Sequence, residues 1–211
     1  MGGIWATLHA ANAGRRHVAA LVTSLAAVIA SPPSIGADAK QLVTTLCAAC
    51  HGEDGNSSVG VYPKLAGLQA DYIVKQIKDF VAGKRKNELM TPIAENLSSG
   101  DIPAIAAHFS AQKPAPGKVE NPQLVAAGKR IFEDGNTTSG VPACAGCHQP
   151  DAAGNERFPR LAGQHQAYIL QELTDLKSGL RANDRGRVMR AVAERMTEDE
   201  MKAVAEYLAG L

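Results

Sequence analysis

The chain has 211 residues, which is enough for one large domain or two small ones. Apolar residues make up 45% of the sequence but aromatic residues only 4%, so a core made of protein alone would depend on aliphatic side chains. The formal net charge is +1, and nothing in the sequence suggests binding to nucleic acid.

The first residues have the pattern of an export signal. Two arginines precede an apolar run from Val18 to Ala30, and a segment of small residues follows. This order predicts a signal over residues 1–37, with cleavage after Ala37 or Ala39. The run of about 13 residues is shorter than the roughly 20 that span a bilayer, and an uncleaved anchor is the alternative. Removal of the signal leaves 20 basic and 21 acidic residues, a net charge of −1.

The remainder of the chain is an internal repeat. YPKLAG (Tyr62–Gly67) aligns with FPRLAG (Phe158–Gly163), and residues of the same type recur after both segments. The matched pairs are Tyr72 with Tyr168, Gly83 with Gly179, Arg85 with Arg181 and Asn87 with Asn183. A proline-rich stretch between the copies predicts a linker over residues 113–122. We therefore expect two domains, 38–112 and 123–211.

Both halves have the same pattern of expected helices. A short helix leads into a cysteine motif, an amphipathic stretch follows over Asp71–Val81 or Gln166–Lys177, and a last helix closes the half. The sequence TEDE at Thr197–Glu200 has the form of a capping box, and Ser98–Asp101 is a weaker relative. Since alternating strand patterns are confined to a few residues, we predict that the domains are all-α.

All four cysteines lie in two copies of one pentapeptide, CAACH at Cys47–His51 and CAGCH at Cys144–His148. The pattern C-x-x-C-H is the attachment signature of c-type haem. The two thiols add to the two vinyl groups of the porphyrin, and the adjacent imidazole is held beneath the iron as proximal ligand. We therefore predict two covalently bound haem c groups with His51 and His148 as iron ligands. The predicted attachment sites are Cys47, Cys50, Cys144 and Cys147.

Other uses of paired cysteines fit the sequence less well. A thioredoxin-like pair needs no histidine and lies near a βαβ pattern, which the sequence lacks. A four-cysteine zinc site brings its pairs within about 15 to 20 residues, whereas most of a domain separates Cys50 from Cys144. Disulfides within the motifs are the plainest alternative in an oxidising compartment, but they would close very small, strained loops.

The methionines are candidates for the sixth iron ligand. Met90 and Met189 occupy matched positions at similar distances after the motif histidines, so we predict that they are the distal ligands, with packing as the alternative. Thioether ligation opposite histidine raises the haem potential and leaves no open iron position. Met196 and Met201 match apolar positions of the closing helix in the first half, where packing is expected.

Residues around the motifs have expected supporting roles. Pro63 and Pro159 follow the motif histidines at nearly equal intervals, and a carbonyl there would accept the second imidazole N–H and fix the tautomer; a simple turn is the alternative. Four basic residues recur at matched positions, where they would face haem propionates or lie on a solvated surface. These residues are Lys64, Arg160, Arg85 and Arg181.

At this point the chain resembles a known family. CAACHGEDG with YPKLAG and Met90, followed by CAGCHQPDAAGN with FPRLAGQ and Met189, is similar to the two-haem cytochrome c4 family over nearly all of the mature chain. The resemblance implies two class I cytochrome c domains and a periplasmic electron carrier, sometimes membrane-associated, that passes electrons from a quinol-oxidising complex to a terminal oxidase or reductase. Carried over by position, it makes the four cysteines the attachment sites. The axial ligands that it implies are His51, Met90, His148 and Met189.

One departure separates the halves, because the second reads CHQPDAAGN where the first reads CHGEDGN. This loop edges the haem, so the two reduction potentials are expected to differ.

An enzyme is the competing prediction, either the haem-bearing electron-transfer subunit of a dehydrogenase complex or a two-haem peroxidase. A peroxidase needs an iron with an open or displaceable sixth position, and the matched methionines argue against one. A dehydrogenase would keep its own chemistry in another polypeptide. We therefore predict an electron-transfer protein without catalytic residues, whose partners are redox proteins. With four ionised propionates its charge becomes roughly −5, which favours a basic docking surface on the partner.

Overall fold

The structure is a computed structural model that describes Gly2 and residues 35–211. Most of the predicted export signal therefore lies outside the described residues, and both expected cleavage points, Ala37 and Ala39, fall inside the first described helix. Within residues 35–211 the regular secondary structure is helical apart from one isolated bridge between Asn136 and Val141, which confirms the all-α prediction. No helix in this range has both the length and the apolar character needed to span a membrane.

The first half begins with a helix that runs almost directly into the first cysteine motif. Its elements are α1 (Ile35–Leu42), the π-helix η1 (Val43–Cys47), α2 (Ala48–His51), α3 (Ala70–Val81), α4 (Met90–Glu95) and α5 (Asp101–Ser110). The closing helix α5 packs against α1 and α3, and α4 packs against α3. The predicted amphipathic helix is confirmed as α3.

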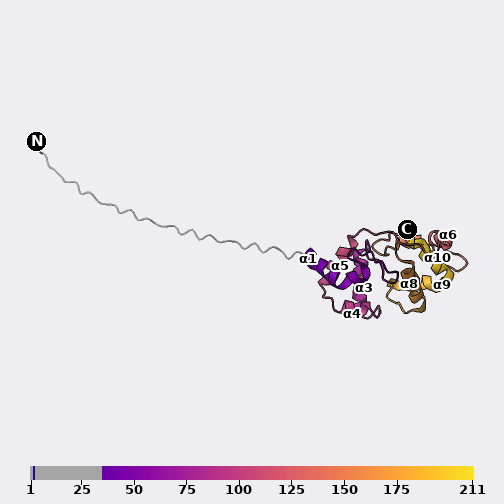
Figure 1. Ribbon diagram of the computed structural model, residues 1–211, viewed down its shortest axis with the longest axis horizontal. Helices are drawn as coiled ribbons and strands as arrows, with labels where there is room; N and C mark the ends of the chain where they lie inside the picture. Colours follow the sequence, from indigo (N-terminus) through magenta and orange to yellow (C-terminus); the bar gives the residue numbers. More distant parts are fainter. Residues whose placement is uncertain (1, 3–34) are drawn as a thin grey trace. The chain divides into compact units, whose positions relative to one another are not determined.

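The second half repeats this arrangement. Its elements are α6 (Pro122–Asp134), α7 (Ala145–His148), α8 (Gln166–Ser178), the 3-10 helix η2 (Arg185–Arg187), α9 (Val188–Arg195) and α10 (Glu198–Ala209). The closing helix α10 packs against α6 and α8, and α9 packs against α8. In Figure 1 the labelled helices of the first half are indigo to magenta, and those of the second half are orange to yellow.

Local signals explain where several helices begin and end. Gly179 adopts a left-handed conformation with φ of 81° and ends α8, because glycine reaches positive φ without a steric penalty. The predicted capping box is present, since the Thr197 side chain accepts from the Glu200 N–H and the Glu200 carboxylate accepts from the Thr197 N–H. The Asn121 side chain caps α6, so Pro122, expected as the last linker residue, is instead the first residue of that helix.

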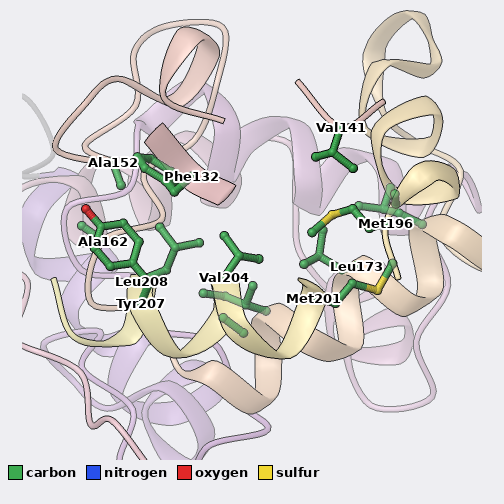
Figure 2. Close-up of a cluster of buried hydrophobic side chains, with 14 residues drawn as sticks. Phe132, Val141, Ala152, Ala162, Leu173, Met196, Met201, Val204, Tyr207 and Leu208 are labelled. Atoms are coloured by element: carbon green, nitrogen blue, oxygen red, sulfur yellow. The ribbon is translucent and has the colours of Figure 1, made fainter. Parts of the chain in front are cut away.

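Each half has its own hydrophobic core. In the second core Phe132 is fully buried and its ring centroid lies 5.5 Å from that of Tyr207. Figure 2 shows Met196 and Met201 in the same cluster, and both are only 2% exposed, in agreement with their expected packing role. The helices α6 and α10 approach closely at Gly128, where a Cβ atom would lie 1.9 Å from the Ala203 carbonyl oxygen. This contact therefore requires glycine.

The linker is hydrogen-bonded to both halves. The Lys64 ammonium of the first half donates to the carbonyl oxygens of Ala115 (3.1 Å) and Pro116 (2.7 Å). On the other side, the Glu120 N–H donates to the carboxylate of Glu206 in α10 at 2.9 Å. These bonds give the linker a defined path between the domains.

Candidate functional site

Each cysteine motif forms a single helical turn. The second motif is closed by bonds from the N–H groups of Cys147 (3.1 Å) and His148 (2.9 Å) to the Cys144 carbonyl. All four thiols are free of disulfide bonds. Burial raises the pKa of Cys47 and of Cys144 to about 11, so both remain neutral thiols at neutral pH. The four thiols therefore remain available for attachment of a group from outside the polypeptide.

The zinc alternative gains no support from the described residues. Within residues 35–211, no three His, Cys, Asp or Glu side chains are grouped so that they could hold a metal ion. The two cysteine pairs belong to different halves of the repeat.

Both motif histidines are buried and held in one orientation. His51 is 6% exposed and His148 is 5% exposed. The Nδ1 atom of His51 lies 2.8 Å from the Pro63 carbonyl oxygen, and that of His148 lies 2.9 Å from the Pro159 carbonyl oxygen, as predicted. Since a carbonyl only accepts, each Nδ1 carries the proton and donates it, which leaves the Nε2 lone pair available. Burial lowers the pKa of both imidazoles, so they are neutral at neutral pH.

An unpartnered nitrogen atom in the second motif also fits the binding of a haem group. The Nε2 atom of His148 is buried and has no hydrogen-bond partner, a state that it shares among the described side chains only with Nε of Arg160. A buried polar atom without a partner costs about 1 to 3 kcal/mol. Coordination of an iron ion by this nitrogen would supply the missing partner, beside two thiols placed to bind the porphyrin covalently.

The methionines fall into two structural classes. Met90 is the first residue of α4 and Met189 is the second residue of α9; both are half-buried against the core of their own half. The loop before Met90 is fixed because the Asn87 side chain accepts from the Met90 N–H at 2.9 Å. Met196 and Met201, in contrast, are enclosed in the second core. Ligation by Met90 and Met189 stays a prediction that these matched positions support.

Three of the four recurring basic residues do not lie on a solvated surface. The side chains of Arg85 and Arg181 are only 12% and 14% exposed, and both contact Glu172 between the halves. Lys64 is 8% exposed, and burial lowers the pKa of its ammonium group. The solvated alternative is therefore wrong for these three residues.

The sequence did not predict two glutamines that join the halves. Gln164 pairs with the backbone of Lys64, accepting from its N–H and donating to its carbonyl, both at 2.9 Å. Gln69 likewise accepts from the Arg160 N–H at 3.0 Å and donates to the Ala153 carbonyl at 2.9 Å. A glutamine shortly after LAG in each half was the only sequence signal, and it does not reveal partners that lie 84 to 100 residues away.

Known proteins match the chain over both halves. The family model for cytochrome c matches residues 36–112 and 125–211. Cytochrome c4 of Thiocapsa roseopersicina is 43% identical over 169 residues, which cover 79% of this chain and 87% of that protein. The crystal structure of reduced recombinant cytochrome c4 from Pseudomonas stutzeri matches with a TM-score of 0.79 at 39% identity, over 83% of this chain and 98% of that chain. The thiosulfate dehydrogenase electron acceptor of Thiomonas intermedia (strain K12) is 38% identical over 199 residues, which cover 92% of this chain and 90% of that protein.

Proposed function

The chain belongs to the cytochrome c4 family, and we propose on this basis that it carries electrons in the periplasm from a quinol-oxidising complex to a terminal oxidase or reductase. It is an electron-transfer protein with two covalently bound haem c groups, one at each CxxCH motif. We also propose that its partners are redox proteins, that it is located in the periplasm and that it associates peripherally with the membrane. An export signal over residues 1–37 would direct it there, and its two domains would span residues 38–112 and 123–211.

The observation that carries the proposal is the pair of buried, oriented imidazoles. The carbonyls of Pro63 and Pro159 keep the proton on Nδ1 and hold each ring in place. When bound, haem supplies an iron ion that alternates between the ferrous and ferric states and so carries one electron. Because the ring is buried and its second nitrogen is bonded to backbone, its position would change little between these states.

We propose that the first haem has His51 and Met90 as axial ligands and that the second has His148 and Met189. Both methionines are only half-buried, lie in the first turn of a short helix and follow the loop after α3 or α8. Two thioether ligands would fill the sixth position of both irons. This coordination suits an electron carrier, whereas a peroxidase needs an iron with an open or displaceable sixth position.

Mass spectrometry and absorption spectra test this assignment. The exported protein should have the mass of the polypeptide plus two haem groups, and the ferric protein should show the weak long-wavelength band of iron bound to methionine sulfur. Met90→Ala and Met189→Ala should each remove about half of that band, since each removes one of two ligands. Met196→Leu is the control, because Met196 lies in the core, and it should leave the band intact.

Three results would contradict the proposal. A mass increase of one haem or none would refute the stoichiometry. A band unaffected by Met189→Ala would mean that another residue ligates the second iron. Rapid, stoichiometric binding of carbon monoxide to the reduced protein would reveal an open iron position and favour a peroxidase.

A second electron donor is favoured by one comparison. A protein named as a thiosulfate dehydrogenase electron acceptor matches 92% of this chain. We propose that a thiosulfate-oxidising dehydrogenase is an alternative donor, in agreement with the expected role beside a dehydrogenase. The oxidised protein should then be reduced when thiosulfate and such a dehydrogenase are added together, but not by either alone. A quinol-oxidising complex supplied with quinol serves as the comparison, and reduction only by the quinol system would refute the alternative.

A further inference from the structure

Two buried arginines meet a single carboxylate between the halves of the repeat. Arg85, in the loop after α3, donates to Glu172 of α8 and to the Tyr168 hydroxyl at 3.1 Å. Arg181, in the loop after α8, donates to the same carboxylate and to the Tyr72 hydroxyl at 3.0 Å. The Glu172 side chain is only 15% exposed. We call these five residues the arginine clasp.

The clasp is symmetric at every position except one. The two arginines occupy matched positions of the repeat, the two tyrosines do so as well, and each arginine contacts the tyrosine of the other half. The position that matches Glu172 holds Gln76, whose side-chain oxygen accepts from Arg85 at 2.9 Å and from Arg181 at 3.3 Å. Both positions therefore reach both arginines, but only one of them carries a negative charge.

The charge balance makes this carboxylate essential to the clasp. Guanidinium groups stay protonated, so two positive charges are buried beside one negative charge. Burial opposes ionisation of Glu172, but the charges of Arg181 and Arg85 and the hydrogen bonds outweigh it, so its pKa is lowered. Loss of one partner from a buried charged network is far more damaging than loss of a surface ion pair, because the remaining charges stay desolvated.

The halves are joined at a second set of contacts that contains no ion pair. Gln164 and Gln69 bond to backbone across the interface, and the His165 ring bonds to the Ser57 carbonyl at 2.9 Å. These bonds involve the loops between the cysteine motifs and helices α3 or α8, whereas the clasp lies on those helices and the loops after them. Beside the clasp, Asn183 of the second half also bonds to α3 of the first. Attachment at both places fixes one orientation, and weaker attachment on the clasp side would permit a hinge motion about the loops.

We propose that Glu172 is a positioning residue for electron exchange between the two haem domains, because its carboxylate is shared by Arg85 and Arg181 and holds both domains in one relative orientation. The proposal rests on the proposed electron-carrier function, since exchange between two haems is the process that the clasp would serve. Electron-transfer rates fall steeply with distance and depend on orientation. A hinge that opens and closes would therefore slow the exchange without altering either haem site.

The test removes the shared charge and then returns it from the other half. In the haem-loaded protein, Glu172→Gln should slow the redistribution of electrons between the two haems after flash reduction by several-fold. It should also speed hydrogen exchange in α3 and α8, with haem content and the methionine band unchanged. The double variant Gln76→Glu/Glu172→Gln places one carboxylate at the matched position, where both arginines reach it, and should restore both rates. Glu194→Gln is the control, because it removes an exposed ion pair with Arg187.

The outcomes separate this inference from the proposed function. Electron exchange at the wild-type rate in Glu172→Gln would overturn the inference. Slow electron exchange in the double variant would overturn it as well, because a carboxylate in α3 restores the shared contact but not a role that Glu172 has within α8 alone. If Glu172→Gln fails to load haem, the single variant Gln76→Glu tests the inference instead. A second carboxylate should slow hydrogen exchange in α3 and α8, and faster hydrogen exchange would refute the shared clasp. Reduction by the partner enzymes is measured separately, and its failure alone would count against the proposed function.

Discussion

Gly52 follows His51 with φ of 77° and ψ of 152°, and Gln149 follows His148 with φ of 71° and ψ of 156°. Three residues further on, Gly55 has φ of 72° and Ala152 has φ of 54°. Glycine adopts positive φ freely, whereas other residues held in such sparsely populated regions cost about 1 to 3 kcal/mol each. The second half therefore stores backbone strain at two places where the first half has glycine.

Long-range hydrogen bonds explain why the backbone path is the same. The Gly55 carbonyl accepts from the N–H groups of Leu65 and Ala66, two residues of the YPKLAG segment. The Ala152 carbonyl accepts the equivalent pair of bonds from the FPRLAG segment. Because these bonds also place the proline that holds each imidazole, the loop keeps its conformation even where the residue type opposes it.

Packing next to the loops compensates for the different side chains. A Cβ atom at Gly55 would lie 2.7 Å from the Ala66 nitrogen and 2.8 Å from the Phe109 ring, so no side chain fits there. In the second half Leu208 takes the place of Phe109, since the carbonyl oxygen of each accepts from the N–H of the matched glycine. Ala152 is fully buried in the same core as Leu208, and a side chain smaller than phenylalanine would leave space there for its methyl group.

The largest expected effect on stability comes from the matched positions 76 and 172, because only Glu172 carries a charge and Gln76 is neutral. The folded pKa of Glu172 lies below its ordinary value of 4.5, so the unfolded chain binds a proton more readily than the folded one. Its contribution to stability is complete above about pH 4.5 and is lost as the pH falls through the folded pKa. Below this pH the free energy of unfolding of the wild type should therefore fall more steeply than that of Glu172→Gln.

Urea unfolding of the haem-loaded protein between about pH 3 and pH 6 measures this difference. The pKa values of Asp184 and Glu200 are also lowered, so Glu172→Gln should retain part of the slope. The wild type should be the more stable protein at pH 6, and the two curves should converge in acid. Parallel curves would show that Glu172 does not titrate with folding.

A loss of about 3 kcal/mol is expected for Gly55→Ala, because overpacking and backbone strain add at this position. Thermal unfolding of the haem-loaded protein measures it. Adding Phe109→Leu copies the arrangement of the second half and should recover part of the loss. Ala152→Gly is the matched control and should change stability by less than about 1 kcal/mol, because relief of strain offsets a small cavity. No recovery in the double variant would contradict the proposed compensation.

Local patterns were enough to predict the helices that frame the sites. The expected stretches Asp71–Val81 and Gln166–Lys177 became α3 (Ala70–Val81) and α8 (Gln166–Ser178), because amphipathic periodicity and a terminal glycine are visible in a short window. The acceptor role of Pro63 was also predictable, since every ligating histidine needs a partner for its second nitrogen.

Features that depend on distant residues were not predictable in the same way. The bond between Arg85 and Glu172 joins positions 87 residues apart, and repeat matching gave only the recurrence of the arginines. The π-helix at Val43–Cys47 and the bridge from Asn136 to Val141 were missed as well. Sequence matching also showed that Gln149 replaces Gly52, but not that it keeps the conformation of a glycine.

The smallest expected effect is a gain of about 1 kcal/mol from Gln149→Gly, because glycine adopts the observed φ of 71° without strain. The reciprocal change Gly52→Gln should cost about 1 to 2 kcal/mol, since it introduces that strain and brings a Cβ atom within 3.1 Å of Asp54. Denaturant unfolding of the haem-loaded variants measures both. If the strain at Gln149 arises only because a residue with a side chain is held at positive φ, Gln149→Gly should raise the unfolding midpoint. The Pro159 carbonyl should still hold His148, so the methionine band should be unchanged. A lower midpoint would mean that the glutamine side chain makes a contact that outweighs the strain. That contact, and not the backbone strain, would then account for the difference in stability between the two loops.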